Sequence, residues 1–220
     1  ACHGFGGDKK SSAIINLAKS LTNYSIGVIT FDFPGHGISN TNGYNYKVEN
    51  CISDINDVEN YIEEKFNNIE VGFFATSYGA YVVLLKINEG TKIYNSIVLR
   101  CPALNMRKIF EENILKIPLN EFLKKEKCIL GFERNIIITK EYYEELTKND
   151  LFKVYNKKDN ILIIHGTLDD MAPIEDSIKF QKKFSKNVKL YMVKGADHRF
   201  KKPGELEEVI KIATNYILNS

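Results

Sequence analysis

The sequence predicts an α/β fold in which a mainly parallel sheet is covered by helices on both faces. Two features of the chain lead to this prediction. Short apolar runs alternate with longer segments of helical periodicity along most of the 220 residues. The apolar runs show little inside–outside alternation, which is typical of strands buried on both faces. Functional groups in such sheets gather at the carboxyl ends of the strands, so the loops after the apolar runs are candidate sites.

Residues 1–101 form the first part of the predicted core. A glycine-rich opening leads into a segment with Ile14, Leu17 and Leu21 on one helical face. Further on, an apolar run leads directly into a serine turn and a second helical pattern, which Gly90 ends as a C-terminal cap. The elements expected are a helix over 10–21, a strand over 25–31, a turn-rich loop over 32–37, a helix over 47–66, a strand ending before Ser77, a helix up to Gly90 and a strand over 96–100.

The segment 102–157 interrupts this alternation. It is rich in Lys, Glu, Asn and aromatic residues, and Pro118 and Gly131 divide it. We interpret it as an inserted cap over one end of the sheet, and its composition is equally consistent with a plain surface excursion. Within it we expect a short β segment over 135–139 and a short helix over 140–148.

Residues 158–220 return to the alternation and form the second part of the core. The run 160–165 is the clearest buried strand of the sequence. The last helix begins near Pro203, a residue well suited to a first helical turn, and three glutamates lie near its positive end. The elements expected are strands over 160–165 and 187–193, and helices over 174–184 and from about 203 onward.

The composition is that of an ordinary globular protein, with 44% hydrophobic and 26% charged residues and a net charge of +2. Its lysines are spread over all segments, so we expect no nucleic-acid partner. No apolar stretch approaches the length of a transmembrane helix.

Four widely spaced cysteines match no metal motif and favour free thiols in a reducing, cytoplasmic compartment. The sequence predicts no metal and no cofactor, and it gives no signal for an oligomeric state.

The stretch Ala75-Thr76-Ser77-Tyr78-Gly79 lies between an apolar run and a helical pattern. A strand followed at once by a helix requires a strained turn, which exposes the hydroxyl of the serine at its tip. Small residues are needed two positions before and after that serine, where the strand and helix backbones pass closely. Ala75 and Gly79 meet this need. Ser77 is therefore the candidate nucleophile.

A serine nucleophile needs a base, usually a histidine that a carboxylate orients. His198 is the candidate base, because it follows the candidate acid Asp169 in the chain order Ser, Asp, His. Asp169 and Asp170 are adjacent, and we prefer Asp169 and treat Asp170 as a solvated or loop-capping carboxylate. The roles expected of other loop residues are structural: burial for His165, turn geometry for His36, Asp32 and Asp197, and backbone geometry around His3.

Acyl transfer also needs fixed N–H donors for the oxygen that becomes negative. One expected donor is the backbone N–H of Tyr78, directly after Ser77. The second is expected from the opening loop, from the N–H of Phe5. The alternative reading of that loop is a glycine-rich turn that binds nothing.

Five loop motifs follow one another along nearly the whole chain. They are His3-Gly4-Phe5-Gly6-Gly7, Asp32-Phe33-Pro34-Gly35-His36-Gly37, Ala75-Thr76-Ser77-Tyr78-Gly79, His165-Gly166-Thr167-Leu168-Asp169 with Pro173, and Gly195-Ala196-Asp197-His198. In order and spacing they resemble the α/β-hydrolases of the serine esterase and lipase type. Within that superfamily the chain is similar to bacterial cinnamoyl and feruloyl esterases and their lysophospholipase-like relatives, which carry an inserted cap. The resemblance implies Ser77 as nucleophile, His198 as base, Asp169 as acid, and Phe5 and Tyr78 as donors.

The chain departs from the family pattern in two places. Ala75 stands where glycine is usual. The family has about three strands before the His-Gly loop, and here the loop opens the chain. We therefore expect the protein's first segment to be absent, which leaves a gap beside the strand that holds Ser77.

The leading functional hypothesis is a serine carboxylester hydrolase acting on a small-molecule ester. A thioesterase or an amidase would use the same residues, and a hydrolase fold that only binds a ligand is the alternative from another class. Aromatic residues of the insertion are candidates for an apolar substrate pocket, and a role as the insertion's own core explains them equally well. These residues are Phe110, Phe122, Phe132, Tyr142 and Tyr143.

Overall fold

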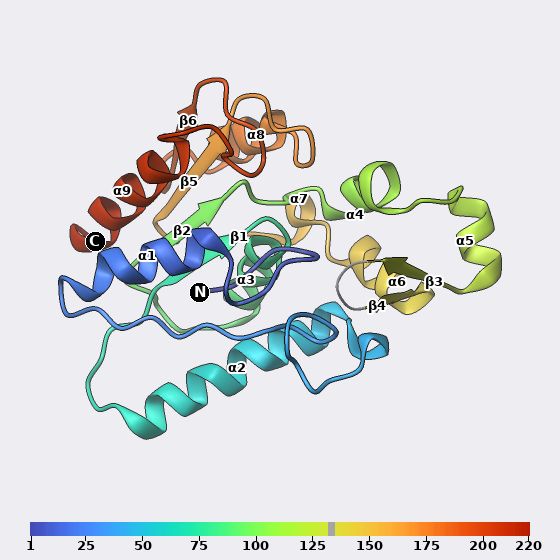
Figure 1. The fold of residues 1–220 in the computed structure, drawn as a ribbon, viewed down its shortest axis with the longest axis horizontal. Coiled ribbons are helices and arrows are strands. Elements are labelled where there is room, and N and C mark those ends of the chain that lie inside the picture. Colours follow the sequence, from blue (N-terminus) through green and yellow to red (C-terminus); the bar gives the residue numbers. More distant parts are fainter. Residues whose placement is uncertain (132–134) are drawn as a thin grey trace.

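The computed structural model of the protein describes residues 1–131 and 135–220. Its centre is a four-stranded sheet in the order β1-β2-β5-β6, and every neighbouring pair is parallel (Figure 1). Within the described ranges this confirms the predicted α/β class and four of the predicted core strands. The strands are β1 Phe73–Thr76, β2 Ile97–Arg100, β5 Ile161–Gly166 and β6 Val188–Val193.

Both faces of the sheet are covered, because successive side chains of a strand point to opposite sides. On one face Phe74 and Val98 pack with α1 and α9, which lie side by side (Figure 1). On the other face their neighbours Ala75 and Leu99 pack with α2, α3 and α8. This explains why the strands read as continuous apolar runs. The core helices are α1 Ser12–Thr22, α2 Val48–Lys65, α3 Tyr78–Glu89, α8 Ile174–Lys183 and α9 Glu205–Leu218, and a 3-10 turn, η1 Gly43–Asn45, precedes α2.

Between β2 and β5 the chain leaves the parallel sheet and forms a small antiparallel one, β3–β4. The expected β segment over 135–139 and the helix over 140–148 are confirmed there. Glu145 ties this segment to the core, since its carboxylate accepts the N–H groups of Val48 and Glu49 at 2.8 and 3.1 Å and so caps α2. The elements are α4 Met106–Ile109, the π-helical turn η2 Phe110–Ile114, α5 Leu119–Lys125, β3 Lys127–Gly131, β4 Asn135–Thr139, α6 Lys140–Lys148 and α7 Leu151–Val154.

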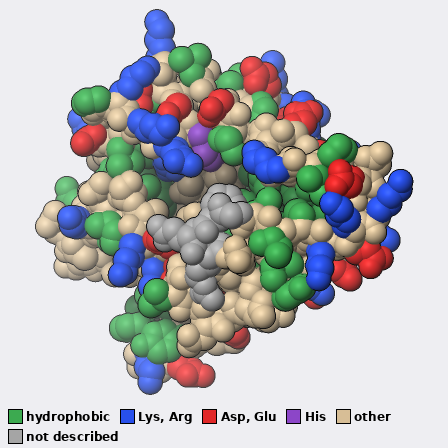
Figure 2. Space-filling model, turned by 45° about the vertical axis from the view of Figure 1, so that its right-hand side comes forward, with side chains coloured by type: hydrophobic (Ala, Val, Ile, Leu, Met, Phe, Trp, Pro, Cys, Tyr) green, Lys and Arg blue, Asp and Glu red, His purple; other side chains and the backbone are tan. Residues whose placement is uncertain are grey.

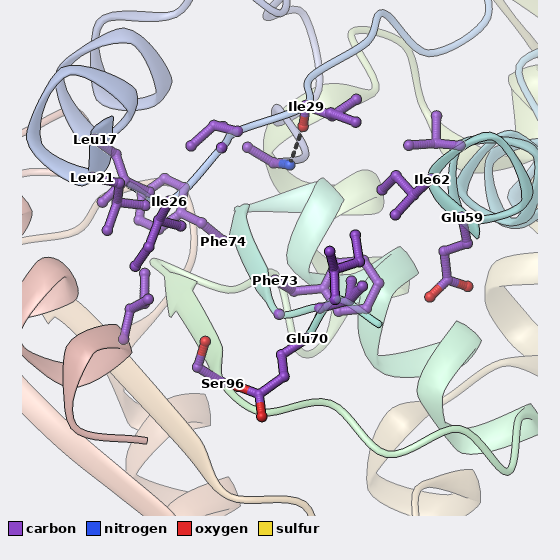
Figure 3. Close-up of a pocket in the computed structure, with 18 of the residues that line it drawn as sticks. Leu17, Leu21, Ile26, Ile29, Glu59, Ile62, Glu70, Phe73, Phe74 and Ser96 are labelled. Atoms are coloured by element: carbon purple, nitrogen blue, oxygen red, sulfur yellow. Dashed lines mark hydrogen bonds between the residues drawn. The ribbon is translucent and has the colours of Figure 1, made fainter. Parts of the chain in front are cut away.

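The prediction of a strand over 25–31 is wrong. That segment runs in an extended path without a strand partner among the described residues. A groove of about 580 Å³ separates it from β1, lined by apolar side chains that include Leu17, Ile26 and Phe73 (Figure 3). The expected gap beside the strand that holds Ser77 is therefore present. A strand needs a ladder of hydrogen bonds, and a segment without a neighbour at ladder distance cannot form one however apolar its sequence.

The first two residues occupy one end of this groove. Cys2 forms an isolated parallel bridge with Ala75, in which Cys2 donates its N–H to Phe74 O at 2.9 Å and accepts the N–H of Thr76 at 3.0 Å. The amino group of Ala1 donates to Ile29 O at 2.7 Å (Figure 3). Two adjacent residues thus connect the outer edge of β1 to the segment beyond the groove, directly before the His3–Gly7 loop.

All four cysteines are free, and Cys51 and Cys101 are fully buried, as their places on a helix and after a strand predicted. Across the two described ranges, no helix combines the length and the apolar character that crossing a membrane requires.

Asp54 on α2 provides a test of how burial affects stability. Burial, together with the nearby Asp57, raises the pKa of Asp54 to about 6. In the unfolded chain an aspartate titrates near 3.9, so the folded state binds more protons between these values and stability falls as pH rises from about 4 to 6. Asp54→Asn removes that loss. Discounted for solvent screening of a half-buried group, we expect about 1 kcal/mol of stabilisation at pH 8 and none at pH 4, measured by urea unfolding. An equal effect at both pH values would contradict the argument.

Candidate active site

Ser77 stands at a sharp turn between β1 and α3. Its backbone has φ 52° and ψ −115°, a conformation that a residue with a side chain adopts only under constraint. The constraint is visible, because the N–H of Ser77 donates to Arg100 O of β2 at 2.9 Å. A side chain at Gly79 would collide with the carbonyl oxygen of His3, so the need for a small residue there is confirmed.

His198 and Asp169 meet as a hydrogen-bonded pair. His198 Nδ1 lies 2.7 Å from Asp169 Oδ2, and the Asp169 carboxylate is fully buried. Its other oxygen, Oδ1, accepts the N–H groups of Met171 and Ala172 at 2.9 and 2.8 Å. Burial alone would raise the pKa of Asp169, but hydrogen bonds from His165 and His198 outweigh it and hold the pKa well below its usual range. Asp169 is thus a stable buried anion.

A second imidazole also reaches Asp169. His165 Nε2 lies 3.1 Å from Asp169 Oδ2 and 2.9 Å from Ala172 O, and its Nδ1 lies 2.8 Å from Ser177 Oγ. The expectation of a buried, structural His165 holds for its burial, but it misses this contact. The signal in the sequence was the spacing of four residues between His165 and Asp169 across a turn.

Arg100 connects the serine turn to the histidine loop. Its backbone carbonyl accepts the N–H of Ser77, and its Nη2 donates to His198 O at 3.2 Å. The buried guanidinium lies over the ring of Phe200, 4.8 Å from its centroid. Sequence reasoning missed this residue, because nothing in an apolar strand that ends with an arginine indicates what the side chain contacts.

The loop His3–Gly7 passes directly beside Ser77. A Cβ at Gly4 would lie 3.1 Å from Ser77 Cβ and 3.7 Å from its Oγ. The peptide N–H of Phe5 follows Gly4, and that of Tyr78 opens α3, where helix amides have no partner within the helix. The two expected donors therefore come from segments that adjoin the hydroxyl.

Two buried histidines fix this loop. His3 Nε2 accepts the N–H of Phe33 and His36 Nε2 accepts the N–H of Gly6, both at 3.0 Å. Their Nδ1 atoms face the carbonyl oxygens of Gly4 and Pro34, at 2.8 and 2.9 Å, which fixes the proton on Nδ1. Burial lowers the pKa of His3 and favours this neutral form. The rings thus do more than the turn and backbone roles expected of them.

Three other acidic side chains lie in loops near the site, where turn roles were expected for Asp32 and Asp197 and a solvated or capping role for Asp170. Asp32 accepts the N–H groups of Lys9 and Ile38 at 2.7 and 3.0 Å. Asp197 accepts the N–H of Arg199 at 2.9 Å. Asp170 is exposed to solvent. This leaves Asp169 as the carboxylate that contacts His198.

The described residues do not join Ser77 Oγ to the His198 ring by a hydrogen bond; such bonds are often long in ligand-free enzymes and tighten with substrate. Only His198 among the four histidines retains appreciable exposure, with 14% of its side chain accessible. Figure 2 shows a histidine at the surface, with hydrophobic and basic side chains around it.

Cys101 Sγ lies within 4.8 Å of possible ligand atoms of Asp169 and His198, a grouping that sequence spacing did not reveal.

The aromatic residues of the insertion pack against one another. Phe110 contacts Phe122, Tyr142 and Tyr143 with ring centroids 5.7 to 5.9 Å apart. Phe110, Phe122 and Tyr142 have no exposed surface, which favours the core role over the pocket role for these three. Phe132 lies outside the described residues.

The fold and these loops define an α/β-hydrolase, and comparisons with known proteins agree. Residues 21–220 match the model of the prolyl oligopeptidase family, so the chain belongs to that family and is a hydrolase. No curated protein matches it.

Several solved structures share the fold at low sequence identity. Est1E from Butyrivibrio proteoclasticus, solved with ferulic acid, has a TM-score of 0.78 at 22% identity over 99% of this chain and 88% of its own. Mouse α/β hydrolase domain-containing protein 10 has a TM-score of 0.78 at 16% identity, over 99% of this chain and 88% of its own. The monoacylglycerol lipase of Paleococcus ferrophilus has a TM-score of 0.72 at 19% identity, over 99% of this chain and 92% of its own.

Gly4→Ala tests the close approach of the opening loop. The new Cβ would lie 3.1 Å from Ser77 Cβ and 3.3 Å from Thr76 O, so the loop and the N–H of Phe5 must shift. We expect kcat for p-nitrophenyl butyrate to fall by about 10- to 100-fold with little change in melting temperature. Gly27→Ala is the matched control, because its Cβ meets nothing within 4 Å. Equal kcat values for the two variants would refute this role of the loop.

Proposed function

We propose that the protein is a serine hydrolase that cleaves carboxylic esters through an acyl-enzyme on Ser77. The observation that carries this proposal is the 2.7 Å contact between His198 Nδ1 and the buried Asp169 carboxylate, beside a serine held at a strained turn. A buried anion on Nδ1 orients the imidazole so that Nε2 is available as a base. The link from Ser77 through Arg100 to the His198 backbone brings the two loops to the same edge of the sheet.

In this mechanism His198 takes the proton of Ser77 as its oxygen attacks the ester carbonyl. The N–H groups of Phe5 and Tyr78 stabilise the negative oxygen of the tetrahedral intermediate. His198 then protonates the leaving alcohol, and the acyl-enzyme forms. A water molecule, deprotonated by the same imidazole, releases the acid and restores Ser77.

The segment 102–157 acts as the cap over this site in our proposal. Its contact with the acid loop supports this, since Asn113 Nδ2 donates to Met171 O at 2.7 Å. Leu168 and Met171 of that loop are exposed and apolar, and they would favour a substrate with an apolar acyl or aryl group. The free thiols favour a cytoplasmic location.

An amidase or peptidase is the second candidate, and the family match supports it. Thioesters are a third substrate class for the same residues. Rates on p-nitrophenyl butyrate, a butyryl thioester and prolyl p-nitroanilide, measured side by side, separate these activities. A hydrolase fold that only binds a ligand would turn over none of them.

Labelling by a fluorophosphonate probe tests the nucleophile. We expect one label per chain, at Ser77, and we expect Ser77→Ala to abolish both labelling and ester cleavage. Ser53→Ala, on the exposed face of α2, is the control and should react normally. Absence of labelling in a folded wild-type protein would refute the proposal.

The adjacent aspartates provide a matched pair for testing the acid. Asp169→Asn keeps the shape but loses the anion on His198 Nδ1, so kcat should fall by roughly 10⁴-fold. Asp170→Asn changes an exposed neighbour and should leave kcat unchanged. Steady-state kinetics of both variants, with circular dichroism to verify folding, decides the assignment. Similar rates for the two would show that Asp169 is not the acid.

A further inference from the structure

The buried contacts of Asp169 extend beyond His198 to two side chains that the proposed mechanism does not use. These are His165 at the end of β5 and Ser177 on α8, both completely buried. His165 lies between them, with Nδ1 at 2.8 Å from Ser177 Oγ and Nε2 at 3.1 Å from Asp169 Oδ2. The result is one continuous path of polar contacts from Ser177 through His165 and Asp169 to His198.

The partners of His165 determine where its proton lies. Nε2 faces two groups that can only accept, the carboxylate of Asp169 and Ala172 O at 2.9 Å. Nε2 must therefore carry a proton. The hydroxyl of Ser177 can then donate to Nδ1, and this bond selects the tautomer that presents N–H to Asp169.

Both imidazoles bind the same carboxylate oxygen. Oδ2 accepts from His198 Nδ1 at 2.7 Å and from His165 Nε2 at 3.1 Å, while Oδ1 is occupied by two backbone N–H groups. A second donor on Oδ2 further restricts rotation of the carboxylate, which the backbone N–H groups hold at Oδ1, and it reduces the basicity of Oδ2. The proton on His198 Nδ1 then stays on nitrogen, as the base role requires.

We propose that His165, oriented by Ser177, is a positioning residue for the catalytic acid, which holds Oδ2 toward His198 and sets its basicity. The inference rests on the proposed function of Ser77, Asp169 and His198. Because it concerns a buried network, it also predicts a property that can be measured without any substrate.

The test compares His165→Leu, which removes both ring nitrogens, with His165→Gln, whose amide carries a donor to about the position of Nε2. Ser177→Ala removes only the hydroxyl that selects the tautomer. Ile163→Val is the control for packing, because Ile163 is equally buried in β5 but points into the apolar core. Other ionisable groups near the path stay unchanged: Arg100, Cys101 and His198 near Asp169, and Asp176 near His165.

In His165→Leu, Oδ2 becomes more basic and binds the His198 Nδ1 proton more strongly. Its far-downfield ¹H NMR resonance should therefore move further downfield. A more basic Asp169 also favours the protonated imidazole, so the acid limb of the pH profile of kcat/KM should move to higher pH by about one unit. At the plateau kcat should fall roughly tenfold with KM unchanged, because the carboxylate is oriented less firmly toward His198. In His165→Gln the acid limb of the pH profile should return to its wild-type position and most of kcat should be recovered. In Ser177→Ala the acid limb should lie between those of the wild type and His165→Leu.

The control Ile163→Val should change neither the resonance nor the acid limb. If His165→Leu leaves both at their wild-type positions, or if His165→Gln behaves as His165→Leu does, the positioning role is refuted and His165 is only a core residue. Absence of ester cleavage in the wild type would instead refute the proposed function. In that case the resonance still decides whether His165 controls the Asp169–His198 bond.

Discussion

The site depends on keeping one carboxylate charged inside the protein. Transfer of an isolated carboxylate out of water is costly, and it is tolerated only when hydrogen bonds replace the lost hydration. Asp169 is fully buried and receives N–H groups from His165, His198, Met171 and Ala172. The end of β5, the turn that follows it and the histidine loop are thereby fixed relative to one another.

The parallel ladder brings the distant parts of the site together. Phe73–Thr76, Ile97–Arg100 and Ile161–Ile164 pair residue by residue, so Thr76, Arg100 and Ile164 lie in one row. The ladder continues past this row, since Ser77 donates to Arg100 O and Cys101 donates to Ile164 O. The chain after each strand must therefore leave the sheet at the same edge. Ser77 and Cys101, which follow β1 and β2 in the chain, therefore lie at one edge of the sheet, and β5 continues two residues beyond the row, to Gly166.

The sequence predicted those parts of the structure that depend on local pattern. The helices of the core and the turn at Ser77 follow from periodicity and small residues, and chain order points to the aspartate pair 169–170 without distinguishing its two members. What could not be predicted depends on contacts between distant segments. The role of Arg100 and the cap that Glu145 provides for α2 are of this kind. The contact of His165 with Asp169 and the pairing of β3 with β4 are local in the chain, and sequence reasoning missed them all the same.

Because residues 25–31 form no strand beside β1, the opening loop must be held in place by other contacts. Among the described residues, Cys2 and Ala1 alone bridge from β1 to that segment, so the loop His3–Gly7 has little support from the sheet. Side chains supply the support: His3 accepts from Phe33, His36 accepts from Gly6, and Asp32 accepts from Lys9. The first two bonds join the loop His3–Gly7 to the loop over 32–37, which follows the extended segment, and the third joins Lys9, just after the opening loop, to the same loop. The position of the loop beside Ser77 is therefore set by contacts between two loops and does not depend on a strand over 25–31.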